Sequence, residues 1–128
     1  GDVRIIQPGY ADRVEGSYSL PALIEEDIHE RIARALRFAG WLLDHVDPNR
    51  RLRTVVPIVS ILEARYAGWK TRSEHAAEPG RMTMSMRTAD GPATVVLTPV
   101  SRPRPALSLQ SGEMAKDFTV LLRRQIRA

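Results

Sequence analysis

The sequence predicts an α+β fold with a long N-terminal helix, a three- to four-stranded antiparallel sheet, and a C-terminal helix packed on one sheet face. Apolar residues recur at steps of three and four over residues 20–47 and again over residues 111–127, as along the buried side of a helix. The segment between them is rich in β-branched residues and contains a strict polar–apolar alternation. Short connections between its strands favour antiparallel pairing, with the helices on one face.

The chain's 128 residues match the size of one domain, because two domains of this total length would each bury too little surface. Residues 1–18 carry Pro8, Gly9 and Gly16 and show no sustained periodicity, so we expect an arm or linker there. Residues 19–128 are expected to form a single α+β domain.

The first helix is expected to begin after Ser19, whose hydroxyl suits an N-cap, and to end at Asp47-Pro48. Gly40 lies inside this helix, where glycine costs about 1 kcal/mol relative to alanine. We therefore expect another part of the chain to approach Gly40 closely. The apolar side of the helix comprises Ile24, Ile28, Ile32, Ala35, Leu36, Ala39, Leu42, Leu43 and Val46.

Strand signals occupy the middle of the chain. A β-branched run is interrupted by Pro57, which cannot donate to a ladder and so starts the strand, bulges it or lies at an edge. A helix over residues 58–67 is the competing interpretation. Residues 81–87 alternate between polar side chains and methionine, and Asp90-Gly91 is expected to join them to a partner strand at 93–98.

The remaining segments carry weaker signals. Residues 72–80 are expected to form a polar loop, and residues 99–105 contain three prolines and are expected to be extended. Residues 106–109 are expected to form a short edge strand. Ser111 is expected to cap the last helix, whose apolar side comprises Met114, Phe118, Leu121, Leu122 and Ile126.

The absence of cysteine excludes disulfides, thiolate zinc sites, iron–sulfur clusters and a cysteine nucleophile. No stretch approaches the roughly 18 apolar residues that a membrane span needs, and the N-terminus lacks the apolar core of a secretory signal. We therefore expect a soluble, cytoplasmic protein with no membrane partner. The leading glycine without methionine suggests a segment of a larger protein.

Basic residues are unevenly distributed. Residues 1–47 hold 5 basic and 9 acidic residues, whereas residues 48–128 hold 14 basic and 6 acidic residues. Arginine accounts for 17 of the 19 basic residues. Arginine suits bidentate recognition of phosphate or carboxylate, but codon bias in a GC-rich bacterial genome explains the same composition.

Signals for catalysis or metal binding are weak. Glu26 and His29 form an E-x-x-H pair, but a di-iron site needs four contributing helices. Ser73 and His75 lie close in sequence, whereas catalytic triads are assembled from distant segments. No phosphate-binding glycine motif occurs. We expect no cofactor, no metal and no catalysis; a small enzyme with a pocket between helix and sheet is the third-ranked alternative.

One side of the first helix indicates contact with another protein. Trp41 falls opposite the apolar stripe, beside Arg34, Arg37 and His45, and Phe38 lies between that side and the stripe. Exposed aromatic and arginine side chains together are typical of binding hot spots. We therefore expect a non-catalytic interaction domain that binds a partner protein or self-associates. The alternative is that another segment of the chain covers Trp41.

A nucleic-acid-binding accessory domain is the second-ranked interpretation. It requires arginines gathered on one sheet face, where they neutralise phosphates, and an aromatic ring for base stacking. The candidate residues are Arg81, Arg87, Arg102, Arg104, Arg65, Arg72, Lys70 and Trp69.

The order helix–three strands–helix, with the run Ser111–Lys116, resembles the double-stranded-RNA-binding domain, whose second helix opens in a similar way. The resemblance covers about twenty residues and the strand order. That family contacts phosphates with a lysine cluster at this helix start, so the resemblance implies such a role only for Lys116. The first helix is much longer than in that family, and membership is not inferred.

Overall fold

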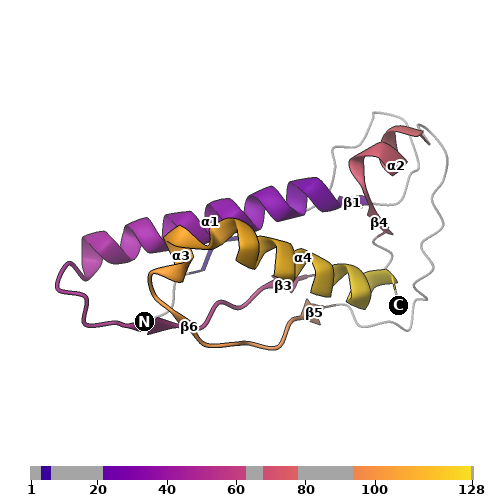
Figure 1. The fold of residues 1–128 in the computed structure, drawn as a ribbon. Coiled ribbons are helices and arrows are strands. Elements are labelled where there is room, and N and C mark those ends of the chain that lie inside the picture. The colour runs from indigo at the N-terminus through magenta and orange to yellow at the C-terminus, as the bar shows by residue number, and fades with distance from the viewer. Residues whose placement is uncertain (1–3, 7–21, 63–67, 78–93, 128) are drawn as a thin grey trace.

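The computed structural model describes residues 4–6, 22–62, 68–77 and 94–127. Its two long helices, α1 (Glu25–Val46) and α4 (Ser111–Arg127), pack together. Figure 1 shows them side by side and running in opposite directions, with strands β3, β5 and β6 below them. The α+β class and both long helices are therefore confirmed.

Helix α1 begins later than the sequence predicts. Residues 22–24 form strand β1 (Ala22–Ile24), which pairs in parallel with β4 (Gly68–Lys70) and is buried throughout. Ile24, whose backbone is extended, is the N-cap of α1. Burial of residues 22–24 in a sheet therefore overrides the helical spacing of their apolar side chains. Ser19, the predicted cap, lies outside the described residues.

The prediction of one antiparallel sheet of three or four strands is wrong. The described strands form three separate two-stranded sheets, of which β1–β4 is parallel. Strand β2 (Thr54–Val55) pairs antiparallel with β6 (Arg102–Pro103), and β3 (Ser60–Ile61) pairs antiparallel with β5 (Val95–Val96).

Both antiparallel pairs join the same two segments of chain, residues 54–61 and residues 95–103, and the pairing register changes between them. Thr54 lies opposite Pro103 and Ser60 opposite Val96, so residues 56–59 face residues 97–101, a segment one residue longer. An extra residue on one strand is a β-bulge. Pro57 and Pro99 lie in this interval, where neither has an N–H to donate. The interruption expected at Pro57 is confirmed, and the helical alternative is wrong for residues 58–62, where Leu97 N donates to Val59 O (3.1 Å).

Two short helices lie where the sequence predicted an edge strand and a polar loop. Helix α3 (Ala106–Leu109) stands where an edge strand was predicted, and Ala106 and Leu107 are buried in it. Helix α2 (Arg72–Ala77) stands in the predicted polar loop. It begins with a capping box, in which Thr71 Oγ1 accepts from Glu74 N and Glu74 Oε1 accepts from Thr71 N, both at 3.2 Å.

The core consists of two clusters joined by Ile32 and Phe118, which pack against both. One lies between the helices and the strands: Leu23, Ile28, Trp69, Val95, Leu97, Leu122 and Ile126. The other lies at the start of α4: Leu36, Ala106, Leu107 and Met114. The apolar side of α1 therefore packs largely on α4 and α3, and only part of it faces strands, contrary to the prediction.

Gly40 has the close neighbour that its position predicted. A Cβ there would lie 2.5 Å from Ser108 Oγ and 3.3 Å from Leu107 Cβ, distances at which these α3 atoms would have to move. The missing side chain lets α3 approach α1.

Several predictions fall outside the described residues. They are the arm at 1–18, apart from residues 4–6, and the alternating strand at 81–87 with its Asp90-Gly91 turn. Of the proposed partner strand at 93–98, Val95 and Val96 form β5, and their described partner is β3.

Candidate partner-binding surface

Phe38, Trp41 and His45 form a continuous row of rings along α1, here called the aromatic row. Their spacing of three and four places them on one side of the helix, away from the buried Leu36 and Gly40. The ring centroids of Phe38 and Trp41 are 5.8 Å apart in a stacked arrangement, and those of Trp41 and His45 are 4.3 Å apart. Phe38 is 47% exposed and Trp41 54% exposed, so the described part of the chain leaves the row open to solvent.

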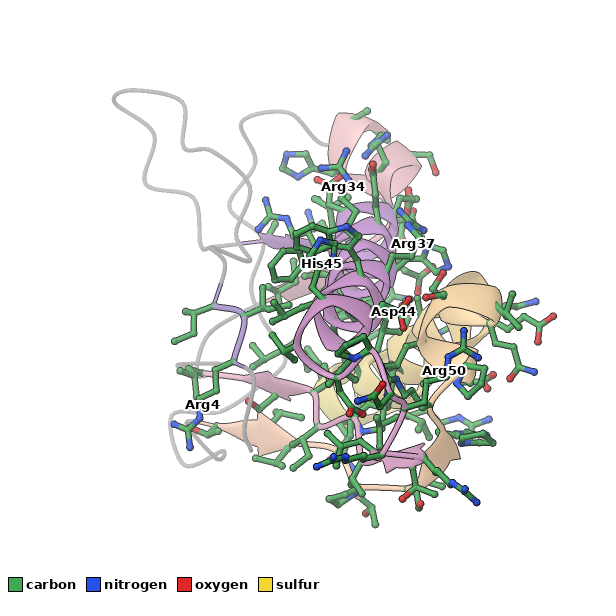
Figure 2. The ribbon with its side chains drawn as sticks, turned by 90° about the vertical axis from the view of Figure 1, so that its left-hand side faces the viewer. Arg4, Arg34, Arg37, Asp44, His45 and Arg50 are labelled. Atoms are coloured by element: carbon green, nitrogen blue, oxygen red, sulfur yellow. The ribbon has the colours of Figure 1, made fainter. Side chains whose placement is uncertain are left out.

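Two arginines flank the aromatic row, as the sequence predicts. Arg34 forms an (i, i+4) ion pair with Glu30 (2.9 Å), which neutralises it. Arg37 is exposed and has no hydrogen-bond or ion-pair partner in the described part of the chain. Figure 2, which looks at the molecule from the end where α1 finishes, shows Arg34, Arg37 and His45 on this helix.

A tight turn follows α1 and presents three more arginines, Arg50, Arg51 and Arg53, here called the arginine turn. All three are exposed. Asp47 closes the turn: its Oδ1 accepts from Arg51 N (3.1 Å), its Oδ2 accepts from Leu52 N (2.8 Å), and its carbonyl accepts from Arg50 N (3.0 Å). Arg50 adopts a left-handed backbone conformation, with φ 52°, to make this turn.

Arg104 joins the arginine turn to β6. Its guanidinium is buried and donates to Asp47 Oδ2 (2.6 Å), to the carbonyl of Leu52 (3.1 Å) and to Asp44 Oδ1 (3.3 Å). The amide of Leu52, the amide of Arg51 and the guanidinium of Arg104 together lower the pKa of Asp47 below its ordinary 3.8, although burial acts in the opposite direction.

Three residues proposed for nucleic-acid contact are buried instead. Arg104 is saturated by the chain's own oxygens, and Lys70 is 7% exposed. Trp69 is 4% exposed, and its Nε1 donates to Glu25 Oε1 (3.1 Å), so its ring faces the core and cannot stack on a base. The strand that carries Trp69 and Lys70 pairs with β1, directly before the start of α1.

The other nucleic-acid candidates are not gathered on one face among the described residues. Arg72 lies at the start of α2, where its guanidinium pairs with Asp27 and its amide donates to Glu26 Oε2 (2.7 Å). Arg102 is half-buried on β6. Arg65, Arg81 and Arg87 lie outside the described residues.

A groove of about 350 Å³ runs between α1 and α4. Several of its polar side chains already have partners within the chain. Glu25 pairs with Arg123 (3.1 Å), His29 Nε2 donates to the carbonyl of Gly112 (3.3 Å), and the Thr119 hydroxyl donates to the carbonyl of Ala115 (2.6 Å). The lining residues are Glu25, Glu26, His29, Lys116, Thr119, Val120 and Arg123.

A second exposed apolar surface lies on the outer side of the β2–β3 and β5–β6 segments. Exposed and partly buried residues alternate there, as in a strand with one face on the core. Its exposed members are Val56, Ile58, Leu62, Val96 and Val100.

The arginine turn was not among the sequence-predicted site residues. Its signal is the run Arg50-Arg51-Leu52-Arg53, directly after the helix-ending Asp47-Pro48-Asn49. A helix stop followed by three closely spaced arginines predicts a basic surface at the end of that helix.

Comparisons with protein families, with curated proteins and with solved structures find no match to this chain. No helix in the described ranges is long and apolar enough to cross a membrane. The same residues contain no group of three or more histidine and carboxylate side chains placed to hold a metal ion.

Proposed function

We propose that this chain is a non-catalytic interaction domain that binds another protein through the aromatic row of α1. The observation that carries the proposal is the exposure of Phe38 and Trp41, 47% and 54%, in direct ring contact on the solvent side of a helix whose other side is packed. Large apolar rings held together in water favour association, because a partner that covers them removes apolar surface from water.

The support for a rigid aromatic anchor comes from the helix beneath it. The row stands on a 22-residue helix whose opposite side is fixed by α3 and α4, so little backbone freedom is lost on binding. Tryptophan and arginine are the side chains that most often dominate binding energy, and Arg37 lies one turn from Trp41. His45 extends the row towards the end of α1.

The partner is identified by placing benzoyl-phenylalanine, a photo-crosslinking amino acid that keeps an aromatic ring, at position 41 and, in a matched protein, at exposed position 124 on α4. A specific partner gives a product only from position 41. With that partner purified, Trp41→Ala should weaken binding by about 30-fold, equivalent to about 2 kcal/mol. Leu121→Ala, at an exposed apolar residue of α4, is the control and should leave the affinity unchanged.

Two results contradict the proposal. If Trp41→Ala lowers the melting temperature as much as a core substitution, Trp41 serves packing instead of binding. If both crosslinking positions give the same products, the contact does not depend on the aromatic row. Circular dichroism of Trp41→Ala detects a loss of folding. Sedimentation equilibrium of the wild type and of Trp41→Ala detects self-association, which would appear as a Trp41-dependent dimer.

A further inference from the structure

The geometry points to an acidic partner. We propose that the protein bound by the aromatic row carries a carboxylate-rich segment that contacts Arg37 and the arginine turn while an apolar side chain covers Trp41. This inference rests on the proposed function and adds the chemistry of the partner to it.

The aromatic row and the arginine turn lie at the same end of the molecule. Trp41 and Asp47 are six residues apart along α1 and its C-cap, a rise of about 9 Å along the helix axis. Figure 2 looks onto this end and shows Arg37, Asp44 and Arg50 following one another down one side of the view. One extended segment of a partner is long enough to touch both.

The backbone of the arginine turn is already held in place in the free chain. The Asp47 carboxylate bonds two amides of the turn, and Arg104 holds that carboxylate at 2.6 Å. Arg104 N also donates to the carbonyl of Arg53 (2.9 Å), which joins the turn to β6. A fixed backbone leaves only side-chain freedom to be lost when the guanidiniums bind carboxylates.

The chain's own carboxylates near this surface are already engaged. Those of α1 and its C-cap accept hydrogen bonds or ion pairs from within the chain: Glu25, Glu26, Asp27, Glu30, Asp44 and Asp47. In contrast, Arg37 and the arginine turn have no carboxylate partner in the described ranges. The surface therefore carries an uncompensated positive charge that an acidic segment of another molecule complements.

A second copy of the chain fits this surface poorly. Symmetric pairing of two α1 helices about Trp41 brings Arg37 of each copy opposite His45 of the other and adds no free carboxylate. Neither copy therefore offers the guanidinium of the other a carboxylate to pair with.

A nucleic acid also fits the surface less well than a protein does. Base stacking needs an open ring face, whereas Trp41 is in contact with Phe38 on one side and His45 on the other.

The test uses the purified chain and a fluorescein-labelled repeat peptide of sequence (Glu-Glu-Leu)n, followed by fluorescence anisotropy at low salt. Arg51→Gln with Arg53→Gln should weaken binding by about tenfold or more. The matched control, Lys116→Gln with Arg124→Gln, removes the same charge from exposed positions of α4 and should change binding less than about twofold. Trp41→Ala should weaken binding of this peptide but not of poly-glutamate.

The outcomes separate this inference from the proposed function. Equal losses in the two double variants show attraction by net charge alone and overturn the acidic-partner inference. Tighter binding of a labelled RNA or DNA duplex than of the acidic peptide, if it depends on Arg51 and Arg53, also overturns this inference. An absence of peptide binding to the wild type does the same. In each of these cases the crosslinking result at position 41 still decides the proposed function.

Discussion

Arg104 and Asp47 form a partly buried ion pair that joins the end of α1 to the residue after β6, with Nη1 of Arg104 2.6 Å from Oδ2 of Asp47. The pair also organises the turn between them, because Asp47 accepts from two backbone amides and Arg104 donates to the carbonyl of Leu52. The exposed arginine turn therefore depends on a fourth arginine, Arg104, which is buried.

Removing this buried guanidinium should destabilise the fold. Arg104→Gln leaves the Asp47 carboxylate without its cation, and we expect the melting temperature to fall by about 10 °C. Arg102→Gln, two residues earlier on β6, has no ion-pair partner among the described residues and should lower it by less than about 2 °C. Differential scanning calorimetry measures both. Equal shifts would contradict the assignment of Arg104 to the fold.

The free energy of unfolding should fall in acid through Asp47 and Glu74. The hydrogen bond from the Leu52 amide lowers the pKa of Asp47 below 3.8, and the Arg127 guanidinium lowers the pKa of Glu74 below 4.5. A carboxyl whose pKa is lower in the folded state than in the unfolded state contributes its full stabilisation of the fold above its ordinary pKa. That stabilisation is lost as the pH falls through the folded-state pKa.

Urea unfolding at about pH 6 and about pH 3 measures this loss. Asp47→Asn should show a smaller difference between the two pH values than the wild type, because it no longer titrates. Asp117→Asn, at an exposed carboxyl of α4, should behave like the wild type. A wild-type difference that Asp47→Asn leaves unchanged would show that Asp47 does not carry it.

The two tryptophans should report opposite environments. Trp41→Phe leaves Trp69, which is 4% exposed, so its emission should be shifted to the blue and resist quenching by acrylamide. Trp69→Phe leaves Trp41, which is 54% exposed, so its emission should be shifted to the red and quenched readily. Similar quenching constants for the two variants would mean that another segment covers Trp41 in solution.

Two glycines should respond oppositely to alanine. A Cβ added to Gly112, in the first turn of α4, would meet nothing within 4 Å, so Gly112→Ala should raise the free energy of unfolding by about 0.5–1 kcal/mol. Gly40→Ala places its methyl group 2.5 Å from Ser108 Oγ and should lower the free energy of unfolding by about 1 kcal/mol. Chemical denaturation compares them, and a stabilising Gly40→Ala would show that α3 moves aside without cost.

The sequence predicted those parts of the fold that depend on local periodicity. The apolar spacing along Ile28, Ile32 and Leu36 and along Met114, Phe118 and Leu122 identified both long helices. The aromatic row was predicted for the same reason, because an angle of 100° per residue places Trp41 opposite the apolar stripe without further information.

Long-range pairing was not predictable in the same way. Residues 22–24 continue the helical spacing of α1, yet they pair with Gly68–Lys70, and only that tertiary contact makes them a strand. The burial of Trp69, Lys70 and Arg104 follows from the same kind of contact. The capping box at Thr71–Glu74 was, by contrast, a local signal that the prediction of a polar loop overlooked.

The packing of α1 on α4 has a consequence for synthesis of the chain. Glu25 and its partner Arg123 are separated by 98 positions, so at translation rates of about 5–20 residues per second α1 leaves the ribosome about 5–20 seconds before α4 does. During that interval Ile28 and Leu36 have no covering helix. The nascent N-terminal half therefore exposes these apolar side chains until α4 has been translated, and only then can the native core close.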